Sequence, residues 1–409
     1  MQHLSNILIL VVALWVMAIS ASAQLLLQPT VEQTHLSDTI DRTAEDFVTV
    51  SLLVADPGLS TYSVLGHACL RMQCPTFDMD YCYTYESENV SNRIGDYLAG
   101  KLKMGLFAVP IKDYCDGYRE EGRGVYEYKL NLPPEAEQEL WRILDEHVAK
   151  GSFLAYDYFK RGCAITCVQF IEKALGEITI QYDTNLLQRK ATSKEIVLSH
   201  CDKFKWSGFG FAFLAAGESE KLVYGSQQLC VPAELVNAWK NATLDGKPFM
   251  VQEPAILVEG TPQWDERWFT PMVLALLILC LSIANLFWSK PYFDWLMLAA
   301  QTAVGAFMMY LICFSDLCCT SWNWLIIPFN ILPAIFWYWR KWWALPYACA
   351  LMIWCGVMSY VAIWGHVLVN WPHIVLVLAW TLILLKQSTN QLRTTTALLP
   401  HYYRTITGQ

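Results

Sequence analysis

Residues 64–72 read VLGHACLRM, and residues 163–175 read CAITCVQFIEKAL. The first run is apolar and typical of a β-strand. The second is flanked by glycines and typical of a helix. A thiol at the N-terminus of a helix has its thiolate stabilised by the helix dipole and by the free backbone amides there. Because a neighbouring imidazole can accept the proton of such a thiol, we predict that Cys163 and His67 form a catalytic dyad.

The spacing within each run predicts how the two elements meet. By alternation, His67, Cys69 and Arg71 share one face of the strand. One face of the helix carries five residues that should pack on a sheet, namely Cys163, Cys167, Phe170, Ile171 and Ala174. We expect this packing to bring the thiol to the imidazole.

The residues around these two runs predict an α+β domain. Strands are expected at residues 47–55, 81–87 and 124–130, the last because its residues alternate in polarity. Pro133 and Pro134 are expected to begin a helix that ends near Lys150, since proline is tolerated in the first turn. The prediction is therefore a small antiparallel sheet covered by at least two helices.

The charge distribution divides the chain into two parts. Residues 269–409 contain six Lys or Arg and two Asp or Glu, whereas residues 1–268 contain 23 and 35. Twelve of the 18 tryptophans lie in the rear part, mostly at the ends of apolar runs, as expected for an aromatic belt at a membrane interface. Most of these runs reach the length of about 20 residues that a membrane-spanning helix needs. Five spans are predicted: Phe269–Trp288, Phe293–Phe314, Trp322–Trp339, Trp342–Trp364 and Trp371–Leu385.

The basic residues and the N-terminus predict one topology. Residues 1–23 are typical of a signal peptide that ends in an Ala-Ser-Ala cleavage site, although without a basic residue in its first segment an uncleaved anchor stays open. Basic residues follow the first, third and fifth predicted spans, which places those ends and the tail, residues 387–409, in the cytoplasm. Residues 24–268 are then an exported domain, and residues 269–386 hold the five spans.

The 14 cysteines suggest no disulfide framework, because they are spread over both parts of the chain. Cys163 has two alternatives to a catalytic role. It could be a buried structural thiol, or it could bind zinc with Cys167 and His67. The Cys-x3-Cys spacing is not the usual spacing for zinc, and no second pair follows.

Several motifs resemble the Lnb-type lipoprotein N-acyltransferases of bacteria. The resemblance begins at residues 51–58 and 62–71 and continues in order along the chain. It includes residues 118–123, 125–132 and 156–159, then Cys163 and Thr166, and in the rear part Trp322-Asn323-Trp324 and Asn330 before Pro333. The chain departs from the family pattern at two points. Gly162 stands where the family has Asn, and Tyr83-Thr84-Tyr85-Glu86 stands where it has Tyr-Asn-Tyr-Gly.

The order of a histidine strand followed by a cysteine helix also resembles the permuted papain-like proteins of the NlpC superfamily, which include lecithin:retinol acyltransferase. This resemblance implies a permuted papain-like fold for the exported domain. It further implies acyl transfer through a cysteine thioester.

The family resemblance implies a lipoprotein N-acyltransferase of the bacterial inner membrane, with its catalytic domain in the periplasm. A phospholipid would donate an acyl chain to Cys163, and the N-terminal amine of a diacylated lipoprotein would accept it. Asp80 and Tyr85 are candidates to orient His67. Arg71 and Arg123 suit phosphate headgroups or structural ion pairs equally well. We expect no nucleic-acid partner, and the chemistry needs no metal or organic cofactor.

Three other functions remain open from the sequence. A phospholipase would share the first half-reaction but release the acyl group to water. A cysteine amidase or peptidase acting on cell-wall peptide would need no membrane spans. A non-enzymatic membrane assembly factor would tolerate the loss of Cys163 and His67.

Overall fold

The computed structural model describes residues 47–60, 62–87, 96, 99–151, 153–155, 162–264, 267–288, 291–316, 327–334, 343–364 and 370–407. These residues form two compact units. The first contains the sheet and runs to Val197, with residues 221–264 added to it. The second contains residues 198–220 and the apolar helices after residue 265. The predicted signal peptide, residues 1–23, lies outside the described residues.

The first unit is built on a seven-stranded antiparallel sheet. Val- and Leu-rich β1 lies inside the sheet and pairs with β2 on one side and β5 on the other. In this register Ala55 lies opposite both His67 and Val125. In order across the sheet the strands are β11 (Ala255–Val258), β5 (Val125–Lys129), β1 (Thr49–Ala55), β2 (His67–Cys74), β3 (Met79–Ser87), β4 (Lys103–Pro110) and β6 (Phe153–Ala155).

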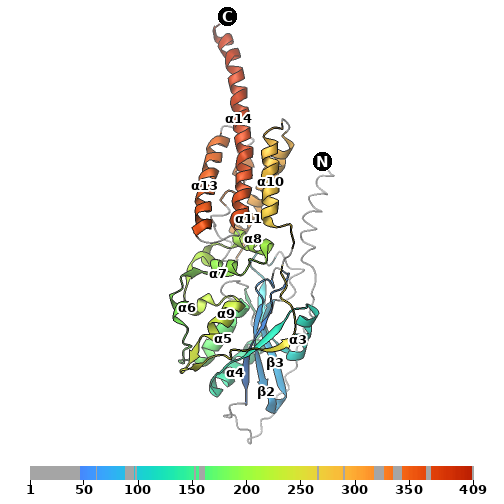
Figure 1. The fold of residues 1–409 in the computed structure, drawn as a ribbon, viewed down its shortest axis with the longest axis vertical. Helices are drawn as coiled ribbons and strands as arrows, with labels where there is room; N and C mark the ends of the chain where they lie inside the picture. Colours follow the sequence, from blue (N-terminus) through green and yellow to red (C-terminus); the bar gives the residue numbers. More distant parts are fainter. Residues whose placement is uncertain are drawn as a thin grey trace. The chain divides into compact units, whose positions relative to one another are not determined.

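Helices cover both faces of this sheet (Figure 1). On one face α4 (Pro134–Ala149), α5 (Cys163–Leu175) and α9 (Pro232–Lys240) bury Leu140, Ile171 and Trp239 against the strands. On the other face α3 (Ile111–Glu120) packs its Tyr114 and Cys115 on the sheet. Alternation along β2 and β3 assigns successive side chains to these two cores.

The predicted mixed domain with a sheet is confirmed, and the sheet is larger than the sequence suggested. Strands occur in all four predicted places, and α4 and α5 match the predicted helices. β4, β6 and β11 were not predicted, and neither was α3. Residues 176–260, for which no element was predicted, contain the helices α6 (Thr184–Gln188), α7 (Ser193–Ser199), α8 (Lys205–Leu214) and α9, and short 3-10 turns. They also contain β11 and two small strand pairs, β7 (Ala191–Thr192) with β8 (Leu222–Val223) and β9 (Thr243–Leu244) with β10 (Lys247–Pro248).

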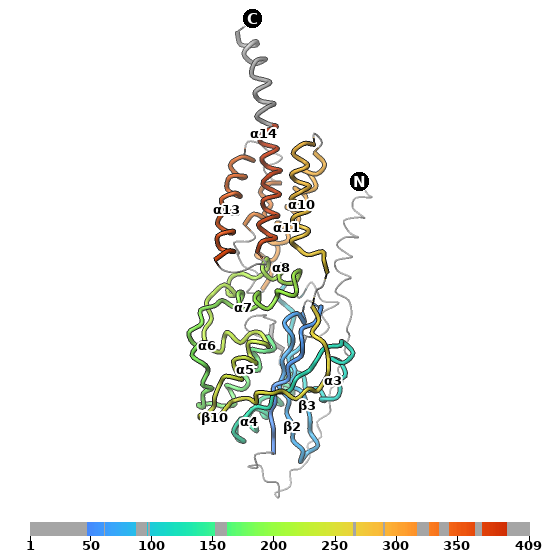
Figure 2. The backbone as a smooth tube through the Cα atoms, in the orientation of Figure 1, coloured from blue at the N-terminus to red at the C-terminus, as the bar shows by residue number. Residues whose placement is uncertain are grey.

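The described part of the second unit contains α8 and the longer helices α10 (Pro271–Asn285), α11 (Tyr292–Phe314), α13 (Ala344–Trp364) and α14 (Trp371–Thr407). Within it, α14 packs between α10 and α13 (Figure 2). Among the described residues three helices are long and apolar enough to cross a membrane, namely α11, α13 and residues 371–390 of α14, while α10 is a shorter apolar helix. The described residues therefore hold three candidate membrane spans, and the predicted number of five is not confirmed.

The predicted third span, Trp322–Trp339, differs from the structure in its described part. Residues 327–331 form a turn, and helix begins only at Leu332. Pro328 has no backbone N–H, which disfavours a continuous helix here. Instead the side chain of Asn330 accepts a hydrogen bond from the Leu332 amide at 2.9 Å, and Gln301 of α11 donates to the Pro328 carbonyl. Gly305 permits this approach, because a Cβ there would lie 2.7 Å from the Asn330 Cα.

A buried ion pair joins three helices of the second unit. Lys386 Nζ lies 3.3 Å from the Asp294 carboxylate and donates to the Asn285 side-chain oxygen at 3.0 Å. Asn285 donates to Asp294 at 2.5 Å, so each member of the group has a partner. Such pairing offsets the cost of burying charge. The group holds the C-terminal end of α10 and the N-terminal end of α11 against α14. Helix α14 itself continues past residue 386, where the membrane-spanning part was predicted to end.

Glu137 in the first turn of α4 predicts a pH dependence of stability. The side chain is buried, and this burial raises its pKa to about 8 despite a hydrogen bond with the Val50 backbone. The folded protein holds this proton more tightly than the unfolded chain does. The resulting contribution to the free energy of unfolding is therefore full below pH 4.5, and it is lost as pH rises to about 8. We expect Glu137→Gln to raise the melting temperature at pH 9 and to change it little at pH 5. Equal shifts at both pH values would contradict this assignment, and exposed Glu139→Gln is the control.

Candidate active site

Cys163 is the first residue of α5, and its surroundings are backbone amides. Gly162 is extended at the N-cap and provides no side-chain cap, so the first-turn N–H groups stay available. The carbonyl of Gly162 accepts the first helical hydrogen bond, from the Thr166 amide at 3.0 Å. The thiol accepts hydrogen bonds from the backbone amides of Ala68 in β2 and Ala164 in α5. The sulfur thus sits at the helix N-terminus, beside the residue that follows His67.

Burial controls the protonation of this thiol. It raises the pKa of Cys163 to about 11, although the hydrogen bonds from Ala68 and Ala164 act in the opposite direction. The resting group at neutral pH is therefore the thiol, and a base must remove its proton before it can attack.

His67 begins β2 directly after a glycine that no other residue can replace easily. Gly66 has φ +80°, and a Cβ there would lie 2.6 Å from the carbonyl oxygen of Ala55. This turn places His67 at the start of the strand. Its Nε2 lies 2.8 Å from the Thr84 hydroxyl oxygen of the neighbouring strand β3.

The imidazole is neutral at physiological pH. Burial and, to a lesser extent, the positive charge of Arg123 together lower the pKa of His67 to about 4. A neutral imidazole can act as a base, whereas an imidazolium cannot. The resting pair is thus a neutral thiol and a neutral imidazole, not an ion pair.

The predicted face of β2 was wrong. Ala68, Leu70 and Met72 share the core with α5, whereas Cys69 lies in the core beneath α3. His67 alternates with Ala68, so it belongs to the α3 face of the strand. Among the described residues no hydrogen bond joins the thiol and the imidazole directly. What links the two positions is the Ala68 amide, which bonds the thiol and belongs to the residue after His67. The helix face was predicted correctly, since Cys167 and Ile171 are buried on the sheet.

Thr84 and Glu86, which were not predicted from the sequence, form a hydrogen-bonded chain that ends at His67. The Thr84 hydroxyl is fully buried and donates to Glu86 Oε1 at 3.0 Å while its oxygen faces His67 Nε2. Both residues lie on one face of β3 at i and i+2. The available signal was the departure from the family pattern, because Thr84 and Glu86 are the two positions of that tetrapeptide that differ.

The two predicted orienting residues are directed to other parts of the structure than His67. Both carboxylate oxygens of Asp80 accept hydrogen bonds from Arg71, each at 2.7 Å, so this carboxylate is directed to the guanidinium. Tyr85 alternates away from Thr84 and lies in the core that α5 covers. Asp80 and Tyr85 therefore occupy different environments from the imidazole.

The two arginines differ in how fully they are paired. Arg71 forms ion pairs with Asp80 and with Glu127, the latter at 2.8 Å. Of the two predicted roles, this arrangement corresponds to the structural ion pair. Arg123 is buried, donates to the Asp56 carbonyl and to Glu121, both at 2.7 Å, and lies over the Tyr118 ring. Its Nη2 has no hydrogen-bond partner within the described structure. Arg123 also lies close enough to His67 to lower its pKa.

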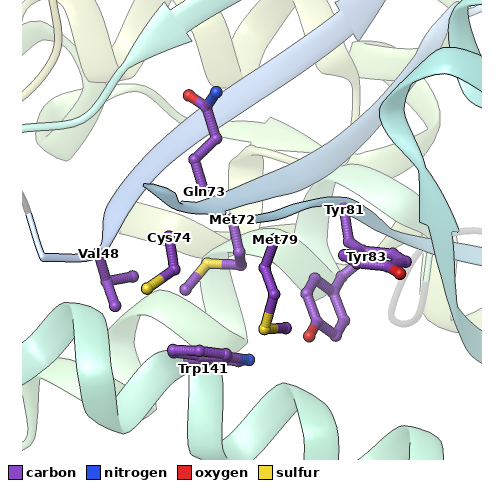
Figure 3. Close-up of a pocket in the computed structure, with 8 residues that line it drawn as sticks. All are labelled: Val48, Met72, Gln73, Cys74, Met79, Tyr81, Tyr83 and Trp141. Atoms are coloured by element: carbon purple, nitrogen blue, oxygen red, sulfur yellow. The ribbon is translucent and has the colours of Figure 1, made fainter. Parts of the chain in front are cut away.

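Figure 3 shows a depression at the opposite end of β2 from His67. It is lined by apolar and aromatic side chains, among them Met72, Met79, Tyr83 and Trp141, and it encloses no space for even one water molecule. None of its lining residues is His67 or Cys163. Among the described residues no group of three His, Cys, Asp or Glu side chains could hold a metal ion, so the zinc alternative for Cys163, Cys167 and His67 has no support there.

Comparison with known proteins identifies the first unit. No curated protein and no solved structure matches the chain. Residues 38–194 match the family described as the Lnb N-terminal periplasmic domain. This range includes His67, Thr84, Glu86 and Cys163, and also residues 156–159 of the resemblance, which lie outside the described residues. Residues 38–194 are therefore similar to the Lnb N-terminal periplasmic domain, and apolar helices long enough to cross a membrane follow them in the chain.

Proposed function

We propose that the protein is a lipoprotein N-acyltransferase of the bacterial inner membrane that uses Cys163 as its nucleophile. The observation that carries the proposal is the position of the thiol. It lies at an uncapped helix N-terminus, bonded to the Ala68 amide beside His67, within a periplasmic domain of the Lnb family. The membrane helices would keep this domain close to lipid substrates, which raises their effective concentration.

The first half-reaction is acylation of the enzyme. His67 accepts the Cys163 proton as the sulfur attacks an ester carbonyl of a phospholipid. The developing oxyanion would be stabilised at the N-terminus of α5, with the Cys163 amide as the candidate donor. The ester C–O bond then breaks, and His67 returns its proton to the lysophospholipid alkoxide. A thioester on Cys163 remains.

The second half-reaction transfers the acyl group to an amine. The free α-amine of a diacylated lipoprotein attacks the thioester, and His67 removes the amine proton. The C–S bond breaks, the amide forms, and the proton returns to the thiol. Splitting the aminolysis of an ester into two steps lowers the barrier of each.

The arginines have separate roles in this proposal. Arg123 is the candidate for a phosphate headgroup, because one of its N–H groups lacks a partner. Arg71 is assigned to the structural ion pair. The permuted papain-like arrangement and five crossings of the membrane remain part of the proposal: a crossing between α11 and α13 is needed to keep Arg340 and Lys341 in the cytoplasm.

Mass spectrometry of the full-length protein tests the function. The protein is incubated with phospholipid and then with a diacylated lipopeptide. We expect an acyl adduct on Cys163 that passes to the α-amine of the peptide, and no adduct in Cys163→Ala. Cys167→Ala, one helical turn away, is the matched control and should acquire the adduct.

The other outcomes separate the rival functions. An adduct that only hydrolyses, leaving the lipopeptide unchanged, would favour a phospholipase. No adduct, together with full complementation of cells by Cys163→Ala, would contradict the proposal and support an assembly factor.

A further inference from the structure

We propose that Thr84 and Glu86 form a positioning relay that keeps the proton of His67 on Nε2, so that Nδ1 is the nitrogen that accepts the Cys163 proton. This inference deepens the proposed function and rests on it. Neither residue touches the substrate in this scheme. They act through His67.

The directions of the hydrogen bonds carry the argument. A hydroxyl has one hydrogen, and an ionised carboxylate can only accept. Thr84 donates its hydrogen to Glu86 Oε1 at 3.0 Å, so only a lone pair of its oxygen can face the imidazole. At 2.8 Å, His67 Nε2 must then be the donor and carry the proton. A neutral imidazole has one N–H, which leaves Nδ1 unprotonated.

Burial of Thr84 makes the tautomer of His67 depend on this hydrogen bond. Thr84 has no exposed surface, so water cannot take over its hydrogen bonds. Without a fixed acceptor the imidazole could place its proton on either nitrogen. A proton on Nδ1 would leave no lone pair there for the thiol, and that fraction of the enzyme would be inactive.

The charge of Glu86 determines the direction of the relay. A protonated Glu86 could donate to Thr84, whose hydroxyl would then donate to Nε2 and favour the other tautomer. Burial raises the pKa of Glu86, the bond from Thr84 lowers it, and Glu121 raises it.

Three further groups face this relay. Tyr118 of α3 lies near Glu86, Arg123 lies near both Tyr118 and His67, and Glu121 follows α3. Of these only Arg123 is cationic, and its guanidinium is bonded to Glu121 and to the Asp56 carbonyl. The acid limb of the acylation rate should therefore follow Glu86 and lie above the pKa of His67, which is about 4.

The test measures the rate at which full-length enzyme forms the Cys163 adduct with phospholipid. Thr84→Val keeps the shape of the side chain and removes the hydroxyl, and it should lower the rate about tenfold, the effect of one hydrogen bond of ordinary strength. Thr84→Ser retains the hydroxyl and should restore the rate. Glu86→Gln should lower the rate and abolish the acid limb assigned to Glu86, while keeping the melting temperature.

A second measurement determines the tautomer of His67 and does not depend on enzyme activity. In protein with 15N-labelled histidine, long-range 1H–15N spectra distinguish protonated from unprotonated ring nitrogens. We expect a protonated Nε2 at His67 in wild type and a mixture of tautomers in Thr84→Val.

The outcomes separate this relay from the function itself. If the wild type acquires the adduct but Thr84→Val and Glu86→Gln react at its rate with an unchanged tautomer, the relay is wrong and the transferase stands. Loss of rate in Thr84→Ser equal to that in Thr84→Val would also overturn the relay, because packing would then explain both. If the wild type forms no adduct, the proposed function fails, while the tautomer measurement still decides the geometry.

Discussion

His67→Gln should lower the rate of Cys163 acylation about 1,000-fold at pH 7, within the range of about 10²–10⁴ that a general base contributes. The thiol pKa of about 11 provides an independent estimate. At pH 7 a thiol of this pKa is ionised to only about one part in 10⁴, so without a base nearly all of the enzyme is unreactive. The measurement is the time course of the acyl adduct by mass spectrometry.

Alkaline pH should partly restore this variant. Between pH 7 and pH 10 its rate should rise about tenfold per pH unit as the thiolate forms, whereas the wild type should change little. His147→Gln is the matched control, because His147 lies on α4, where its Nδ1 bonds the Ile143 carbonyl at 2.8 Å. Acylation of His67→Gln at the wild-type rate would show that another group removes the proton.

Replacing Arg71 by Met should lower the free energy of unfolding by about 3 kcal/mol, near the lower end of the cost of breaking a buried ion pair. Arg71 and Glu127 are nearly buried, with 11% and 13% of their side chains exposed, whereas Asp80 is 35% exposed and regains some water. Loss of the guanidinium leaves two carboxylates without their shared cation. Denaturant unfolding of the full-length protein measures the change.

Two further variants determine whether the charge is responsible. Arg71→Lys keeps the charge but not the paired geometry with Asp80, and it should recover only part of the loss. Adding Asp80→Asn and Glu127→Gln to Arg71→Met removes the unpaired charges and should recover most of it. If instead Arg71→Met raised the KM for phospholipid with unchanged stability, Arg71 would bind headgroups.

The sequence was most informative where local chemistry decides structure. Gly162 before Cys163 and Gly176 after Leu175 mark the ends of α5, and prolines mark the start of α4. Alternation predicted β5 from its polarity alone. Strands β6 and β11 are short, with three and four residues, and their ladders depend on partners distant in the chain, so no local pattern indicated them.

In the helical unit, too, the sequence did not predict structure that depends on residues distant in the chain. Composition and the tryptophan distribution were sufficient to predict apolar helices, and three candidate spans were found. Hydropathy did not reveal the turn at residues 327–331, because the polar contacts that compensate it come from Gln301 and Tyr347 on other helices.

The sequence by itself determined the residue types of the candidate site, the helix that begins at Cys163, and the match of residues 38–194 to the Lnb N-terminal periplasmic domain. These follow from local signals: glycines that set backbone conformation, and motifs in a fixed order. Only the tertiary structure decided that α5 covers the Ala68 face of β2, that Asp80 belongs to Arg71, and that Thr84 and Glu86 stand behind His67. Each of these depends on register and burial across strands, where hydrogen bonds compete for partners that the order of residues along the chain does not specify.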